Sequence, residues 1–188
     1  NIETTEEAVT DTTDTTENVT LAQTISTTDA AGGVLSLNYP DSWFAEQFAG
    51  AITLSNSDAT ATSENLVSGQ LIGSLLILPV ADIGIEGESS AETVLTTFIE
   101  DTVTIAQDAE FVLNDLESFQ ANGNSAVIQT GTGTDPAGTV DIANIVVDID
   151  GNFVLISFLA PEGEMAQYDA TLRALAGAVS YDFPEAEG

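Results

Sequence analysis

The chain contains 188 residues, of which 31 are Asp or Glu and one, Arg173, is basic, so its formal charge is −30 at pH 7. Because it has no Lys, His or Cys, it cannot form a Ser-His-Asp or Cys-His nucleophile system, a zinc site with Cys or His ligands, a P-loop or a lysine Schiff base. The same charge disfavours nucleic acid and anionic lipid headgroups as partners, because their phosphates would be repelled.

The first 18 residues differ in composition from the rest of the chain, because nearly all of them are Thr, Glu, Asp or Asn. A segment of this kind buries too little apolar surface to offset the entropy lost on ordering, so we expect residues 1–18 to form a tail or linker. Asn18 opens an Asn-Val-Thr sequon and is a candidate N-glycosylation site. We expect one domain over residues 19–182 and a short acidic tail at 183–188.

The first part of this domain alternates between apolar and polar residues, which is the pattern of half-buried strands. Alternation begins at Val19, and further strands are predicted at 34–40, 51–57 and 70–80, with a polar loop over 58–68. The last of these strands holds the strongest candidate for a membrane segment. It is too short to cross a bilayer, so we expect no membrane span.

Two segments have helical periodicity. Ser89 and Glu92 have the spacing of a capping box ahead of apolar residues, which predicts a helix over about 90–107. The second predicted helix covers about 163–179, and Arg173 lies on its polar side, where we expect it to pair with a carboxylate. The apolar positions are Val94, Leu95, Phe98 and Ile105 in the first helix, and Met165, Tyr168, Leu172, Leu175 and Val179 in the second.

Between the helices the sequence predicts two hairpins. Asn122-Gly123 separates strands over 110–120 and 125–134, and Asp150-Gly151-Asn152 separates two further strands. The last two strands are apolar at both alternating positions, which is typical of strands covered on both faces. Helices on opposite sides of the sheet would supply that cover. The predicted fold is therefore α+β, a three-layer α-β-α sandwich with a central antiparallel sheet.

Two stretches of the chain resemble a known family. The tyrosine-proline-x-x-tryptophan element at 39–43, and the closing apolar strand, Ala160-Pro161 and amphipathic helix, resemble the PsbP-like α/β/α sandwich. More narrowly, they resemble small exported bacterial proteins, many of them lipoproteins, over about residues 20–182. The resemblance implies an extracellular or cell-surface location and an N-terminal tether to membrane or wall. It also implies structural roles for Tyr39, Pro40, Trp43 and Tyr168.

The known functions of that fold do not carry over on residue matches. Plant photosystem PsbP proteins bind metal and a large membrane complex, and a nuclear-transport family with this fold binds a small GTPase, but the residues of those sites have no counterpart here. The fold hosts binding modules more often than enzymes. Trp43 and Phe44 are either a core plug at a strand end or an exposed contact patch.

Two acidic segments are candidate sites for a hard cation such as Ca²⁺. Asp82, Glu86 and Glu88 lie in one loop before the first helix, and they form either a cation site or a solvated acidic loop. Asp148 and Asp150 resemble part of a calcium loop. No Glu follows at the distance an EF-hand needs, so a hairpin turn is the favoured interpretation. No other cofactor is expected.

These observations favour a non-enzymatic structural or interaction module at the cell surface that associates with other protein subunits, itself included. The hypothesis extends to a surface assembly or filament held through the N-terminal segment. The alternative is a monomeric exported domain of the lipoprotein type that binds a ligand or divalent cation. A glycan hydrolase using two carboxylates is the weakest hypothesis, because with 31 acids in the chain the presence of a pair means nothing without its geometry. The acidity itself suits either salty surroundings or cation binding.

Overall fold

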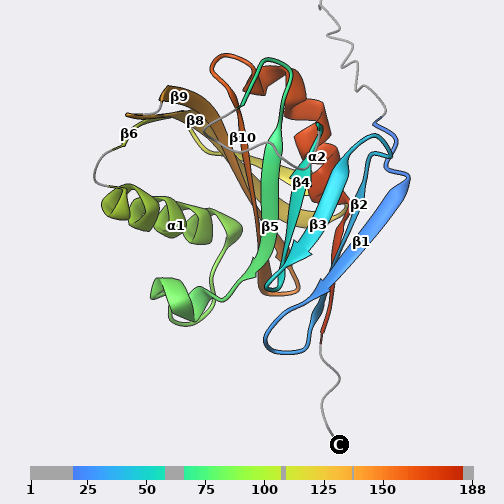
Figure 1. Ribbon diagram of the computed structural model, residues 1–188. Helices are drawn as coiled ribbons and strands as arrows, with labels where there is room; N and C mark the ends of the chain where they lie inside the picture. The colour runs from blue at the N-terminus through green and yellow to red at the C-terminus, as the bar shows by residue number, and fades with distance from the viewer. Residues whose placement is uncertain (1–18, 58–65, 107–108, 137, 184–188) are drawn as a thin grey trace, which may run out of the picture.

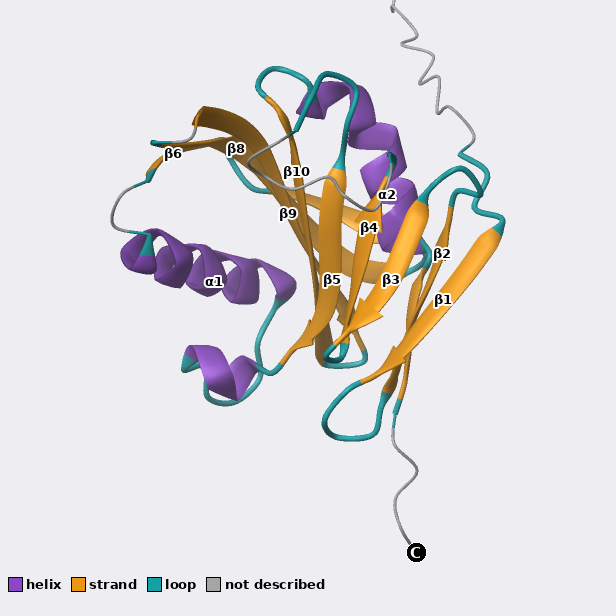
Figure 2. Cartoon of the chain, in the orientation of Figure 1, coloured by secondary structure: helices purple, strands orange, loops and turns teal. Residues whose placement is uncertain are grey.

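The computed structural model describes residues 19–57, 66–106, 109–136 and 138–183, and within them it shows two antiparallel sheets and two α-helices (Figures 1 and 2). The helices are α1 (Ala91–Ile105) and α2 (Asp169–Gly177), and each follows a short 3-10 turn, η1 (Val80–Ile83) and η2 (Met165–Tyr168). The small sheet has the order β1 (Gln23–Thr28), β2 (Val34–Tyr39), β11 (Val179–Asp182). The large sheet has the order β3 (Phe44–Phe48), β4 (Ala51–Ser55), β5 (Ile72–Leu78), β10 (Asn152–Pro161), β9 (Gly138–Ile149), β8 (Asn124–Asp135) and β6 (Glu110–Leu113), and β7 (Glu117–Ala121) also pairs with β8.

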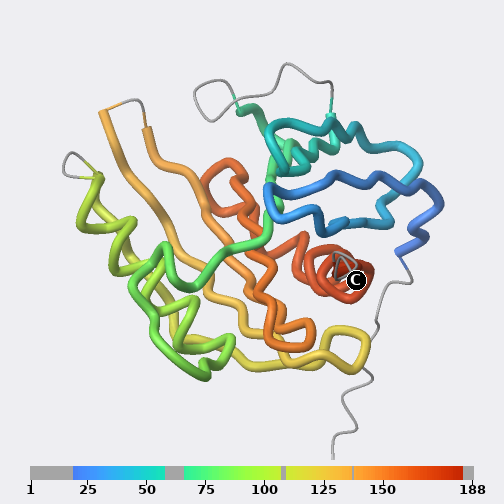
Figure 3. Tube along the Cα trace, turned by 90° about the horizontal axis from the view of Figure 1, so that it is seen from below, coloured from blue at the N-terminus to red at the C-terminus, as the bar shows by residue number. Residues whose placement is uncertain are grey.

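The large sheet is covered on both faces, as the two-phase apolar pattern predicted. Side chains of one phase, including Val146 and Leu155, pack against α1. Side chains of the other phase, including Val147 and Ile156, pack against α2 and the small sheet. Figure 3 shows α1 on one side of the sheet, with α2 and the N-terminal strands on the other. The predicted α+β three-layer fold with a central antiparallel sheet is therefore confirmed, and the small sheet shares the second outer layer with α2.

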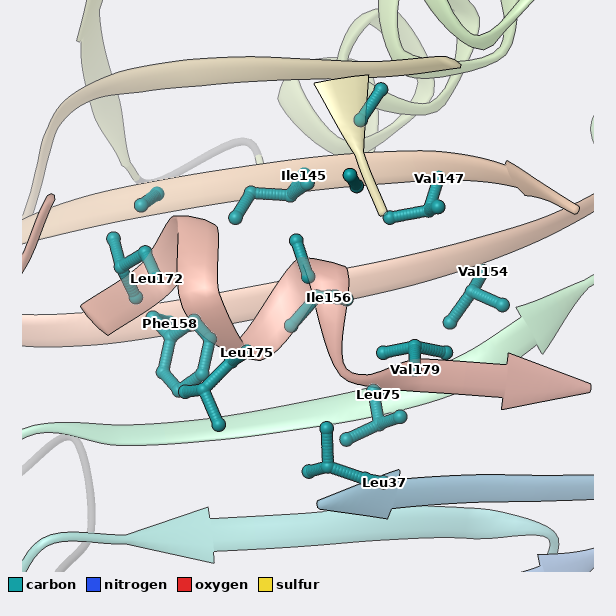
Figure 4. Packing of buried hydrophobic residues seen from close by; sticks show 14 of the residues in the cluster. Leu37, Leu75, Ile145, Val147, Val154, Ile156, Phe158, Leu172, Leu175 and Val179 are labelled. Carbon is teal, nitrogen blue, oxygen red and sulfur yellow. The ribbon is translucent and has the colours of Figure 1, made fainter. Parts of the chain in front are cut away.

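The principal core lies between the large sheet, α2 and the small sheet. Leu172 and Leu175 of α2 are fully buried and point toward Phe158 and Ile156 of β10 (Figure 4). Burying side chains of this size contributes about 1.5–3 kcal/mol each to folding. The ring of Phe158 lies directly on Gly73 of β5, where a Cβ atom would collide with it, so glycine is required there by close packing.

Two strands were missed by the sequence pattern. The sequence pattern places residues 44–48 past the end of a strand, but they form β3. This strand follows a turn at Pro40, in which the Trp43 N–H donates to the Pro40 carbonyl. Four of the five residues of β3 are exposed, so no alternating buried face marks it. Val179 was assigned to the end of the last helix, but it opens β11, because that helix ends with Gly177 and the chain then pairs with β2.

Other boundaries also differ from the predictions. The single strand predicted over 110–120 is divided into β6 and β7 at Asn114, whose N–H donates to the Thr130 carbonyl. The helix predicted over 163–179 is a 3-10 turn followed by nine residues of α-helix. The predicted tail at 1–18, the predicted tail at 183–188 apart from Phe183, and most of the loop predicted at 58–68 lie outside the described residues.

The predicted helix α1 is present, but its cap is shifted by one residue. Ser90, and not Ser89, is the N-cap, and its hydroxyl accepts from the Thr93 N–H at 3.2 Å. Ile105, predicted on the apolar face, is the last residue of α1 and is 79% exposed. The buried face consists of Ala91, Val94, Leu95 and Ile99.

Candidate functional site

The only basic residue of the chain is held by two carboxylates. Arg173 lies on α2, and its Nε donates to both carboxylate oxygens of Asp169, one turn earlier, at 2.9 and 3.1 Å. Its Nη2 lies 2.9 Å from Oε1 of Glu117 on β7, and the guanidinium carbon lies 4.8 Å from the ring centroid of Phe119. The hydrogen bond to Asp169 is the main cause of a raised pKa at Arg173. The prediction that this residue pairs with a carboxylate is confirmed.

Arg173 lies in a cleft of about 440 Å³ between α2 with η2 and the strands β6 to β9. We call this cavity the Arg173 cleft. Four carboxylates and one guanidinium line it, together with Asn and Thr side chains and an apolar floor, so the cleft carries excess negative charge. Its lining includes Asp115, Glu117, Asp141, Asp169, Asn114, Thr130, Thr132, Val112, Ile128 and Leu172.

Asp141 is the most deeply buried acid of the cleft, with 7% of its surface exposed. It lies on β9, where one carboxylate oxygen accepts from the Met165 N–H at 2.9 Å and so attaches η2 to the sheet. Its other oxygen has no hydrogen-bond partner among the described residues. The sequence analysis did not select Asp141. The available signal was an acid inside the mostly apolar strand that includes Ile142 and Ile145.

Hydrogen bonds hold the rim of the cleft where β6 turns into β7. The Asn114 N–H donates to the Thr130 carbonyl at 2.9 Å, and its side-chain amide donates to the Thr130 hydroxyl at 2.8 Å. Gln129 donates in turn to the Asn114 carbonyl at 2.8 Å. These contacts fix the position of the segment that carries Asp115 and Glu117.

A second surface feature lies at the opposite end of the large sheet. A groove of about 380 Å³ runs over β3, β4, β5 and β10, on the face that α1 covers only farther along the sheet. We call it the β3 groove. Its apolar lining includes Phe44, Ile72 and Leu159, and its polar lining includes Glu46 and several Ser and Thr residues. Phe44, the first residue of β3, is 50% exposed, and Phe48, the last residue of the strand, is 77% exposed.

Solved structures that are similar to this one include two bacterial proteins. One is cyanobacterial PsbP (CyanoP) from Synechocystis sp. PCC 6803, with a TM-score of 0.52 and 14% identity over 87% of this chain and 95% of that protein. The chain has a PsbP-like fold. The other is LpqN, described as involved in cell envelope biogenesis of Mycobacterium tuberculosis, with a TM-score of 0.50 and 16% identity over 85% of this chain and 91% of that protein. No protein-family profile and no curated protein matches the sequence.

In this PsbP-like domain, the four residues predicted to be structural lie at the edge of the main core. Tyr39, Trp43 and Tyr168 are half-buried and pack against it, and Pro40 forms the turn that leads to Trp43. Burial is the main cause of a raised pKa at Tyr168. Trp43 and Phe44 were expected to form either a core plug or an exposed contact patch. Trp43 packs on the core, whereas Phe44 is exposed.

The acids predicted to bind a cation do not form a metal cluster. The described part of the chain, which includes all five of them, contains no group of three or more acidic side chains placed to hold a metal ion. Asp82 lies in η1, and Glu86 and Glu88 are exposed in the following loop. The predicted Ca²⁺ site therefore has no support from the geometry.

The structure instead assigns turn roles to the second acidic pair, as the favoured interpretation predicted. Asp148 accepts from the Gly151 N–H at 2.8 Å, and Asp150 has a positive φ of 51° in the hairpin between β9 and β10. The candidate glycosylation site at Asn18 lies outside the described residues. No helix in the described ranges is long and apolar enough to cross a membrane.

Proposed function

We propose that the protein is an exported, non-enzymatic interaction module that acts by associating with other subunits, including copies of itself. The observation that carries this proposal is the exposure of Phe44 and Phe48 on β3, the terminal strand of the large sheet. Exposed apolar side chains beside a groove on the terminal strand of a sheet are typical of protein contact surfaces. The absence of Lys, His and Cys leaves carboxylates as the main chemistry available for catalysis.

The occupant that fits β3 best is β3 of a second copy. On one face, β3 presents Phe44, Glu46 and Phe48 in alternation. Antiparallel pairing about Glu46 places Phe44 opposite Phe48 of the partner subunit, and the reverse, which forms two aromatic cross-strand pairs. Each such pair contributes about 0.2–1 kcal/mol. Among the described residues, β3 is hydrogen-bonded to β4 and to no other strand, and β1 of the small sheet lies close to it. We propose that the outer edge of β3 takes this pairing.

The charge of the chain makes this association dependent on salt. Pairing brings Glu46 close to Glu46 of the partner subunit and brings two bodies of charge −30 together. At about 1 M salt the Debye length falls to about 3 Å, so most of this repulsion is screened. A two-fold contact through β3 closes a dimer, and a filament needs a second contact. We propose the N-terminal segment for that role, although residues 1–18 lie outside the described part of the chain.

Export is supported by the fold and by the charge. LpqN, which has a similar fold, is described as involved in cell envelope biogenesis. A chain with 31 acids and one base suits a salty exterior and does not suit contact with nucleic acid. Fractionation of the source cells tests this part of the proposal, and recovery of the protein with the soluble cytosol would contradict it.

Sedimentation velocity tests self-association. We expect the full chain to be monomeric at low salt and to associate at about 1 M NaCl. Phe48→Glu should abolish association, and Ile105→Glu is the matched control, because Ile105 is equally exposed on α1, away from β3. A monomer at all salt and protein concentrations would contradict the proposal. Association that survives Phe48→Glu would show that the contact lies elsewhere.

The alternative function, a monomeric ligand-binding domain, is favoured by one observation, the Arg173 cleft. The proposal that the protein is not an enzyme can be tested directly at the Arg173 cleft. Turnover of a glycan or another substrate that disappears on replacing Asp141 by Asn would overturn it.

A further inference from the structure

We propose that the Arg173 cleft binds a small organic cation through an alkylammonium group, with Asp141 as the principal anchor. The proposal does not depend on self-association, because the cleft lies beside β6 to β9 and the β3 groove lies at the other end of the large sheet.

The first argument is the free carboxylate oxygen that Asp141 presents to the cleft. One oxygen of Asp141 accepts from Met165, and the other has no hydrogen-bond partner among the described residues. The one fully buried side-chain atom without a partner in those residues is Ser89 Oγ, so the second oxygen of Asp141 can be reached from the cleft that this residue lines. No other side chain of the protein can offer it a positive charge. Its single base, Arg173, already pairs with Asp169 and Glu117.

The second argument is the size and lining of the cleft. A cavity of about 440 Å³ is within the range of about 300–1,000 Å³ that is usual for small-molecule sites. Val112, Ile128 and Leu172 provide apolar contacts for aliphatic carbon, and Asn114 and Thr130 provide oxygen atoms around them. An alkylammonium ion has this combination of an apolar chain and N–H donors.

Other ligand classes fit less well. An anion would meet four carboxylates, and the one guanidinium that could receive it is already occupied by two of them. A bare Ca²⁺ ion takes six to eight oxygen ligands, whereas no three acids among the described residues are grouped to hold a metal. A neutral polyol would leave the charge of Asp141 uncompensated. An organic cation alone supplies both charge and donors.

The test is calorimetric titration of the full chain with 1,4-diaminobutane, with 1,4-butanediol as the neutral molecule of the same shape. Moderate salt suppresses non-specific attraction to the acidic surface. We expect one diamine per chain and no binding of the diol. Asp141→Asn keeps an oxygen that can accept from Met165, so this variant should fold, and it should bind the diamine at least about tenfold more weakly. Asp182→Asn, an exposed acid on β11, is the matched control.

Three outcomes would overturn the proposal: equal binding by Asp141→Asn and wild type, a stoichiometry of many diamines per chain, or comparable binding of the diol. A second readout needs no variant. Because the chain has one arginine, its NMR spectrum contains a single guanidinium Nε–H signal. We expect 1,4-diaminobutane to shift the Arg173 signal in a saturable manner at the same concentrations, and an unchanged signal at saturation would also overturn the proposal.

Discussion

The hydroxyl of Tyr181 donates a hydrogen bond of 2.6 Å to the Asp29 carboxylate, between residues 152 positions apart. Asp29 also accepts from the N–H groups of Ala31 and Gly33, at 2.8 and 2.9 Å. One carboxylate therefore shapes the turn between β1 and β2 and attaches it to β11, the last strand of the domain. The ends of the described domain are held together at this point.

Replacing Tyr181 by Phe should destabilise the domain by about 1–2 kcal/mol, because it removes a hydrogen bond to a charged acceptor and keeps the buried ring. The urea midpoint of unfolding measures the effect. Tyr39→Phe is the control, since no hydrogen bond of the Tyr39 hydroxyl is present among the described residues. Equal losses in the two variants would contradict a specific role for the Tyr181–Asp29 contact.

The same contact should appear in the alkaline titration of the protein. The hydrogen bond to Asp29, burial and the negative charge of Asp29 raise the pKa of Tyr181 to about 12. Because the pKa in the folded state exceeds the usual value of 10.0, the stabilisation is complete below pH 10 and is lost between pH 10 and pH 12. Absorbance of tyrosinate should include a titration at about pH 12, and Tyr181→Phe should remove it.

At acid pH the Tyr181–Asp29 contact acts through the pKa of Asp29, which is lowered and not raised. Burial raises the pKa of Asp29, but the hydrogen bonds from Tyr181, Gly33, Ala31 and Gly32 outweigh it, so the pKa lies below its usual 3.8. The stabilisation from Asp29 is therefore present above pH 3.8 and is lost as the pH falls through the folded-state pKa. Asp29→Asn should reduce the pH dependence of the unfolding midpoint in this range. An unchanged acid limb in that variant would contradict the assignment.

Gly33→Ala should destabilise the domain by about 1–3 kcal/mol, because a Cβ atom at this position would collide with the ring of Tyr181. The cause is steric, so it should disappear when the ring is removed. In a Tyr181→Ala background, the added cost of Gly33→Ala should be small, and a double-mutant cycle measures the coupling. Additive effects of the two substitutions would show that the cost has another origin.

Replacing Arg173 by Met should cost at most about 1 kcal/mol, although it removes the only positive side chain. Its two carboxylate partners are largely exposed, at 54% and 65% of their side chains, so water screens both ion pairs. The stacking of the side chain on Phe119 is retained in part by Met. Thermal unfolding at low and high salt should show a smaller difference from wild type at high salt. A large loss that does not depend on salt would contradict this account.

Local patterns allowed the central elements to be predicted from sequence. Strands β9 and β10 have apolar residues at both sets of alternating positions. This pattern predicts that other elements cover both faces of these strands, whichever elements they are. The hairpin at Asn122-Gly123 followed from two residues that accept positive φ, observed at 52° and 90°. The charge and the missing residue types excluded whole classes of chemistry without any structure.

Tertiary structure alone decided which surfaces and side chains have partners. Strand β3 has no buried alternation of its own, so it exists because β4 pairs with it. Asp141 is one acid among 31 in the sequence, and only the tertiary packing around β9, with η2 attached to it, makes it a largely buried residue. The physical reason is distance along the chain: periodicity reports contacts within a few residues, whereas these contacts join segments that folding brings together.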